Sequence, residues 1–233
     1  MKVLVFELRG SIAHFRYPDT TVTHVTYPFI TRTAVRGLLG AILGLECFAP
    51  EEGLTGIRLM SPVRKSVQGI SMLGKGFLGE GNEFSRWTST ELLVSPHYRI
   101  FYAGPFLDEL AQAIKARQSV YHTYLGVAFA QTFPEWKGVR QGVSYQADAA
   151  DIITTLSVVP THVVGQLVMQ HRSQVARVGG MLYEYLGDRR FRGTINLLYD
   201  TNCGPITFMP SVAPFSPRVE LVDVAEEGIV CLW

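Results

Sequence analysis

The fold is decided by the stretch Tyr27–Glu46, which reads YPFITRTAVRGLLGAILGLE. Thr31 is placed to cap a helix that begins at about Thr33, because its hydroxyl can accept an unpaired backbone N–H. Apolar residues then recur at the spacing of one helical face, at Val35, Leu38, Leu39, Ile42 and Leu45. We therefore expect a helix over residues 33–46 that packs on a sheet.

A second face of this helix carries Gly37, Gly40 and Gly44, roughly 150° from the apolar stripe at about 100° per residue. Three glycines inside a helix cost roughly 2–3 kcal/mol relative to alanine. Such a cost is tolerated where another backbone must come close. Arg32 and Arg36 lie on the flank between the two faces, so we expect protein or nucleic acid near the glycine face.

Composition gives only weak evidence about function. The chain has 233 residues and a net charge of +1, so it has no global field that would attract nucleic acid. Arginine outnumbers lysine roughly three to one. The planar guanidinium suits phosphate and bases, but a surface that uses arginine for salt bridges explains the same count.

No cofactor is expected. The three cysteines, Cys47, Cys203 and Cys231, are far apart and form no C-x-x-C motif, so neither a metal site nor a disulfide framework is indicated. Residues 1–7 lack the layout of a signal peptide, and no apolar run is long enough to span a bilayer. We expect a cytoplasmic protein with reduced cysteines.

The order of elements in the first half indicates an α+β fold. The pattern predicts a strand over 3–16, the helix, strands over 57–72 and 87–102, a second helix from Pro105, and a strand over 124–130. This β-α-β-β-α-β order is the ferredoxin-like (RRM-like) arrangement of many RNA-binding domains. We expect one such domain over residues 1–131.

Residues 132–150 show no clear period and are expected to be a loop or linker. A smaller β-rich C-terminal lobe is expected over 150–233, with strand-like runs at 152–159, 163–169, 194–199, 206–209 and 219–232.

Strands 57–72 and 87–102 are expected to form one long projecting hairpin. Ser61-Pro62 and Ser95-Pro96 lie symmetrically about Leu78, so both prolines would interrupt the ladder at one level and bend the hairpin. Residues 74–79 match G-x-G-x-x-G, but no helix follows them, which argues against a dinucleotide site.

The hairpin carries a basic and aromatic set: Arg64, Lys65, Lys75, Arg86 and Trp87. Such an arm can follow a phosphate backbone and stack on bases. The alternative is a solvated hairpin that docks on another protein through its apolar tip.

Histidine supplies the only candidates for RNA cleavage without metal, which needs a general base and a general acid. His14 lies beside Arg16 on the first strand, and His122 follows Tyr121. A single histidine at the end of a strand is more often a hydrogen-bonded structural residue.

Several segments together resemble a known family. They are residues 6–10, 13–16, 26–33 and 37–45, followed by 91–100 and 121–126. The compound pattern is similar to the N-terminal signature of the CRISPR-associated Cas five proteins of the RAMP superfamily, most like the type I-B branch.

The resemblance implies a subunit of Cascade, the RNA-guided complex of antiviral defence. It would bind the 5′ handle of the CRISPR RNA and cap the filament of Cas seven backbone subunits. It would also contact the large subunit (Cas eight type), and target DNA indirectly. The hairpin over about residues 57–102 corresponds to the family's thumb. The expected RNA-binding residues are Arg16, Arg32, Arg36, Arg64, Lys65, Lys75, Arg86 and Trp87.

One branch of that family, in type I-C systems, cuts the CRISPR precursor with a tyrosine and an adjacent Lys-His pair. No histidine here has lysine beside it, so we expect a non-catalytic subunit. Two alternatives stay open: a metal-independent endoribonuclease that uses His14, His122 or Tyr121, and a scaffold that binds only protein.

Overall fold

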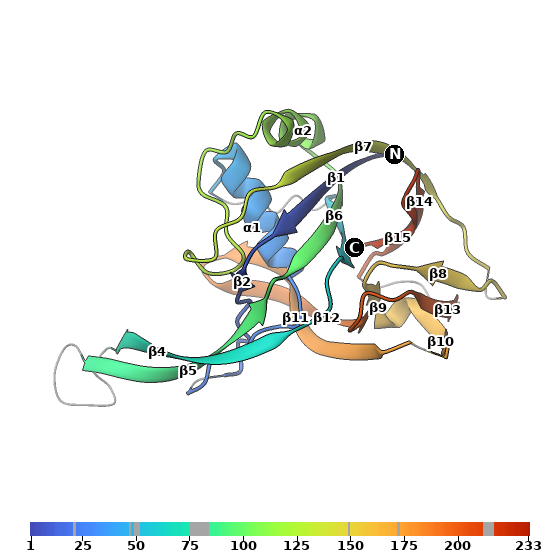
Figure 1. Cartoon of the computed structure of the whole chain (residues 1–233). Helices are drawn as coiled ribbons and strands as arrows, with labels where there is room; N and C mark the ends of the chain where they lie inside the picture. The colour runs from blue at the N-terminus through green and yellow to red at the C-terminus, as the bar shows by residue number, and fades with distance from the viewer. Residues whose placement is uncertain are drawn as a thin grey trace.

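The computed structural model describes residues 1–20, 22–46, 48, 52–74, 84–148, 150–171, 173–211 and 217–233. It is an α+β structure, mostly β with two helices (Figure 1). The helices are α1 (Arg32–Leu43) and α2 (Leu107–Lys115), and a 3-10 turn covers Thr161–Val163. The strands are β1 (Lys2–Arg9), β2 (Ile12–Ala13), β3 (Leu54–Leu59), β4 (Lys65–Gly74), β5 (Phe84–Val94), β6 (His97–Ala103), β7 (Glu135–Ser144), β8 (Ile153–Thr155), β9 (Val159–Pro160), β10 (Val164–Val168), β11 (Val175–Gly187), β12 (Arg190–Asp200), β13 (Ile206–Pro210), β14 (Glu220–Val224) and β15 (Gly228–Leu232).

A six-stranded antiparallel sheet organises the molecule, in the order β15-β14-β7-β1-β6-β3. Its first four strands in the chain are β1, β3, β6 and β7, with α1 between β1 and β3 and α2 between β6 and β7. The last two strands of the sheet come from the C-terminal part of the sequence. Both parts of the sequence thus contribute strands to one sheet. The division into domains 1–131 and 150–233 stays a prediction.

The two edges of this sheet meet. Thr55 on β3 and Trp233 after β15 exchange two backbone hydrogen bonds, of 2.9 and 3.1 Å. Gly56 permits this approach, because a Cβ there would lie 2.7 Å from Leu232 Cδ2 and 3.0 Å from the Cys231 carbonyl oxygen. The sheet therefore curls back on itself.

The alternation of β1 separates two cores. Leu4, Phe6 and Leu8 pack in the cluster that includes the buried faces of α1 and α2. Val3 and Val5 point the other way, into a cluster with residues of β3, β6, β14 and β15. Side chains on alternate positions of a strand point to opposite faces, so both faces of β1 are buried.

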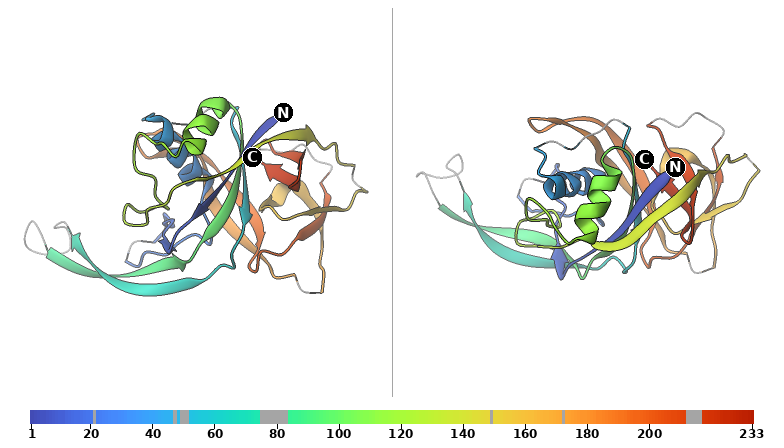
Figure 2. Two further views of the ribbon diagram at one scale, coloured as in Figure 1. Left: turned by 45° about the horizontal axis from the view of Figure 1, so that its top comes forward. Right: turned by 90° about the horizontal axis from the view of Figure 1, so that it is seen from above.

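The projecting hairpin is confirmed. Strands β4 and β5 pair antiparallel from Lys65 opposite Leu93 to Gly74 opposite Phe84, and they extend away from the body in every view (Figures 1 and 2). The expected bend is present where β3 gives way to β4, and Ser61 Oγ donates to the Ser95 carbonyl at 3.1 Å. Most of the glycine-rich tip lies outside the described residues.

The rest of the C-terminal part forms two small sheets, β10-β13-β8 and β11-β12-β9. The long β11–β12 hairpin runs past α1 (Figure 1). Its turn is made by Asp188 and Arg189, both at positive φ. Within the described part of the chain, neither helix is long and apolar enough to cross a membrane.

Three expected elements were wrong. The first strand ends at Arg9 and resumes only as β2, with Gly10 between them. Residues 124–130 form a loop, and β7 takes the fourth position of the sheet, in the segment expected to be a linker. A bulge where β7 pairs with β1, with Gly138 at φ 133°, breaks the alternation that would have revealed β7. Paired glycines similarly hid β11, which contains Gly179 and Gly180.

Candidate nucleic-acid interface

Helix α1 positions the candidate site. The predicted cap is confirmed, since Thr31 Oγ1 accepts from the backbone N–H of Ala34 at 3.1 Å. The helix ends earlier than expected, at Gly44, a C-cap at φ 74° that meets the side chain of Val120. Gly40 lies against Phe48 of the same chain. Gly37 differs from both, since a Cβ there would meet no atom of another described segment within 4 Å.

Two hollows meet over Gly37. The larger, which we call the α1 pocket, has a volume of about 420 Å³ and is lined by α1, the β2 region and the β11–β12 hairpin. The smaller, about 210 Å³, lies between α1 and residues 122–126. Both share Ala34, Gly37 and Gly126 in their walls, so they form one groove along the exposed face of α1.

The wall of the α1 pocket contains the buried polar residues His14, Thr31 and Arg36, and His14 and Arg36 are each only 4% exposed. Arg36 Nη2 donates to the Gly53 carbonyl oxygen at 2.6 Å, and His14 Nδ1 lies 2.7 Å from the Glu91 carbonyl oxygen. Burial lowers the pKa of both side chains. His14 is therefore neutral at pH 7, whereas an arginine stays charged.

Arg32, which we expected to bind RNA, has a structural position. It is 3% exposed, and its guanidinium donates to the carbonyl oxygens of Trp233 (3.0 Å) and Tyr183 (2.7 Å). It also lies 4.2 Å from the centre of the Tyr183 ring. Burial, and then the nearby Arg36, lower its pKa to about 10. Arg32 thus links α1 to β11 and to the closing edge of the sheet, and it faces no solvent.

The other expected RNA-binding residues differ in their exposure and in their contacts. Arg16, Arg64, Lys65 and Trp87 are exposed, and Trp87 is 76% exposed on β5. Lys65 is already engaged, since its Nζ contacts Glu91 Oε2 at 2.9 Å and the Thr26 carbonyl oxygen. Arg86 is in β5 opposite Met72, and Lys75 lies outside the described residues.

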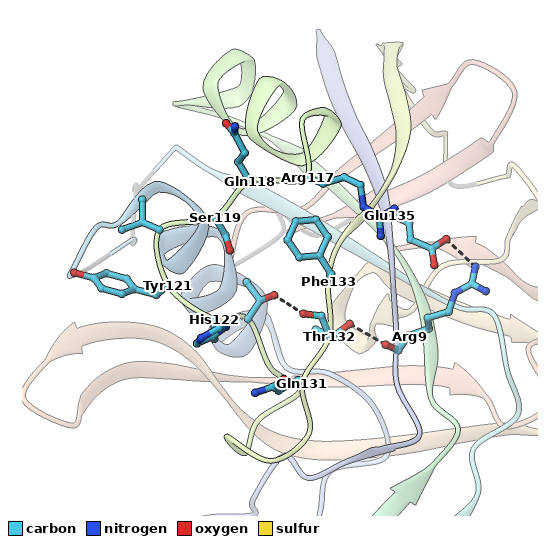
Figure 3. Close-up of a pocket in the computed structure, with 12 residues that line it drawn as sticks. Arg9, Arg117, Gln118, Ser119, Tyr121, His122, Gln131, Thr132, Phe133 and Glu135 are labelled. Atoms are coloured by element: carbon cyan, nitrogen blue, oxygen red, sulfur yellow. Dashed lines mark hydrogen bonds and ion pairs between the residues drawn. The ribbon is translucent and has the colours of Figure 1, made fainter.

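A third hollow, of about 900 Å³, lies on the other side of the segment 118–123. Figure 3 shows Gln118, Tyr121 and His122 on one side of it and Phe133 and Glu135 on the other. Tyr121 and His122 are exposed, and Arg9 pairs with Glu135 at 2.9 Å. His122 also lines the smaller hollow of the groove along α1, whereas Tyr121 borders only the third hollow and His14 is buried in the wall of the α1 pocket.

A charged network lies away from the groove, around Glu7. This carboxylate is 3% exposed and accepts from Arg99 at 2.6 Å, His97 at 2.9 Å and Lys137 at 3.1 Å. Burial alone would raise the pKa of Glu7, but these three donors together lower it to about 2. The network ties β1 to β6 and β7.

Comparison with known protein families identifies the family of this chain. The sequence model described as "CRISPR-associated protein (Cas_Cas5)" matches residues 3–156, more than half of the 233 residues. The chain belongs to the CRISPR-associated Cas5 family. No curated protein matches the sequence significantly.

Solved structures share the fold of this Cas5 protein at low identity. One is a chain titled "CRISPR RNA-guided surveillance complex", with 14% identity, a TM-score of 0.57, and coverage of 90% of this chain and 91% of that one. Another is a CRISPR protein from Archaeoglobus fulgidus, with 11% identity, a TM-score of 0.55 and coverage of 99% of both chains.

The Cas5 match covers α1, the hairpin and the segment 117–126, but not β11 and β12. Two residues of the site that sequence reasoning missed lie there: Tyr185 and Phe191, which line the α1 pocket and are 37% and 38% exposed. Their aromatic type was a signal. Only the pairing of β11 with β12, which sets them opposite each other, brings them to α1.

Proposed function

We propose that this Cas5 protein is a non-catalytic, RNA-binding subunit of a type I Cascade complex. It holds the 5′ handle of the CRISPR RNA and caps the filament of backbone subunits, in support of RNA-guided DNA recognition. The backbone (Cas seven) and large (Cas eight type) subunits are its proposed protein partners. We assign β1-α1-β3-β6-α2-β7 to the ferredoxin-like RAMP core and β4–β5 to the thumb.

One observation carries this proposal: the projecting β4–β5 hairpin presents Trp87 to solvent at 76% exposure. An exposed indole on a projecting arm is a stacking platform for a base, and stacking of that kind accepts any sequence. Arg64 is exposed at the base of the same arm and has no ion pair among the described residues. It supplies charge for phosphate.

The groove along α1 gives the RNA a second place to lie. Its floor at Gly37 is open, and exposed Arg16 lies at its wall. Arg32 is not part of the proposed RNA-binding set, because its guanidinium is buried and donates to the chain's own carbonyl oxygens.

Binding of a fluorescent CRISPR-repeat RNA to the purified full chain, followed by anisotropy, tests the proposal. We expect Trp87→Ala to weaken binding about tenfold or more, as for loss of one stacked base. The matched control is Phe129→Ala, which removes another exposed aromatic ring, 59% exposed, from a loop outside the hairpin. Equal affinity of both variants and the parent chain would reject the hairpin as an RNA contact.

A second candidate function is metal-independent cleavage of precursor RNA. The observation that favours it is the open hollow of about 900 Å³ with Tyr121, His122 and Arg117 in its wall. Incubation of the protein with repeat RNA in a chelator separates the two functions. Specific cuts that His122→Ala abolishes would establish the nuclease, whereas intact RNA supports the non-catalytic subunit.

A further inference from the structure

The α1 pocket contains buried hydrogen-bonding groups that no described residue of the chain pairs with. Among the described residues, Nε and Nη1 of Arg36 have no acceptor, and Nε2 of His14 has no partner. Both side chains are 96% buried, as each is 4% exposed, and both line the pocket. Buried polar groups in native proteins are almost always paired, so these atoms point to a missing partner.

The two side chains offer opposite kinds of hydrogen bond. A carbonyl oxygen only accepts, so the 2.7 Å contact with the Glu91 oxygen places a hydrogen on Nδ1 of His14. In the neutral ring Nε2 is then an acceptor. The guanidinium of Arg36 only donates. A ligand that satisfies both must carry an acceptor and a donor.

This requirement favours a nucleobase over a phosphate. A phosphodiester has acceptors but no donor for Nε2 of His14. The Watson–Crick edge of every nucleobase presents both an acceptor and a donor. The pocket volume of about 420 Å³ lies within the range of small-ligand sites, roughly 300–1,000 Å³.

The walls also suit a flat ring. Tyr185 and Phe191 are register partners on β11 and β12, with ring centres 5.4 Å apart. Both are partly exposed where they line the pocket. Proteins that read single-stranded RNA stack splayed-out bases on such side chains and bond their edges.

We infer that the α1 pocket binds one splayed-out nucleobase of an RNA, stacked at Tyr185 and Phe191 and hydrogen-bonded by Arg36 and His14. This inference rests on the proposed function, because it assigns a position within the bound RNA. It predicts that the base of one handle nucleotide contributes more to binding affinity than the bases of its neighbours.

The first test scans the handle RNA with single abasic substitutions, each measured by anisotropy with the full chain. We expect one position at which loss of the base weakens binding about tenfold or more. Arg36→Met and Tyr185→Ala should each remove that dependence, while Phe129→Ala should keep it. Thermal melting checks that each variant is folded, and partly exposed Tyr185 provides the variant that least disturbs the core.

The second test separates the pocket from RNA binding as a whole. Adenosine, guanosine, cytidine and uridine are titrated by NMR against the full chain, with ribose 5-phosphate as the phosphate probe. Saturable shifts with a nucleoside that Tyr185→Ala abolishes support the inference. Shifts with ribose 5-phosphate alone, or none with any probe, overturn it. If RNA binds but every abasic position behaves alike, the pocket assignment fails and the proposed function stands.

Discussion

The indole of Trp87 lies directly over the backbone of Gly69 on the neighbouring strand of the hairpin. A Cβ at Gly69 would overlap Trp87 Cζ2 and lie 2.7 Å from its Nε1, inside van der Waals contact. The absence of a side chain at Gly69 thus lets a large exposed ring lie against the hairpin. Gly69 therefore helps to set the position of the stacking platform proposed above.

We predict that Gly69→Ala lowers RNA affinity about tenfold while the fold stays intact. The new methyl group must displace the indole, and an exposed ring moves without disturbing a core. Anisotropy measures affinity and urea denaturation measures stability. The control is Ser89→Ala, opposite Gly69 in the ladder. A Gly69→Ala protein that binds RNA as well as the parent would refute this role.

Arg32→Ala is predicted to destabilise the fold by about 3 kcal/mol, because carbonyl oxygens that now receive charged donors would be left buried without them. Arg16→Ala, on an exposed side chain, should change the free energy of unfolding by less than about 0.5 kcal/mol. Urea denaturation checks both values. An Arg32→Ala protein of normal stability with weakened RNA binding would restore the direct RNA contact expected from the sequence.

The glycines of α1 should respond in opposite directions to alanine. Gly37→Ala is predicted to stabilise the protein by about 1 kcal/mol, since its Cβ meets open space and alanine favours the helix. Gly40→Ala should instead destabilise it by about 1–3 kcal/mol, because its Cβ would lie 2.9 Å from Phe48 Cβ. Melting temperatures of the two variants test the pair, and stabilisation by both would show that Phe48 yields freely.

The Glu7 network should make stability depend on acid pH. The folded-state pKa of Glu7 is lowered from 4.5 to about 2, so the carboxylate stabilises the fold above pH 4.5 and loses that contribution as pH falls towards 2. Glu7→Gln should therefore cost roughly 3 kcal/mol at pH 7 and little near pH 2. Urea denaturation at both pH values checks this, with Glu109→Gln, at an exposed position of α2, as the control. A cost that is the same at both would contradict the assignment.

Local signals predicted much of this fold. The hydroxyl of Thr31, the apolar stripe of α1 and the paired Ser-Pro steps each act within a few residues, and each appears where expected. The sequence did not reveal β7 or β11, because glycines and a bulge disrupt their alternation. These two strands form because they pair with β1 and β12, and their local sequence pattern does not predict that pairing.

In the candidate site, too, local sequence predicts some features and long-range contacts determine the others. Exposed Trp87 followed from its place on a hairpin, whereas burial of Arg32 depends on Trp233, a residue 201 positions away. No local sequence pattern predicts such a contact. The proposed roles of Arg36 and His14 likewise follow from the three-dimensional structure, in which side-chain nitrogens of both residues have no partner among the described residues.

The closure of the sheet by β15 has a consequence for synthesis on the ribosome. Chains emerge from the N-terminus and fold as their parts appear. Strands β3 and β7 are complete long before β14 and β15, so their outer edges must wait with unpaired N–H and C=O groups. Such edges readily capture strands from other molecules. The nascent protein is thus most vulnerable to aggregation just before its last two strands arrive.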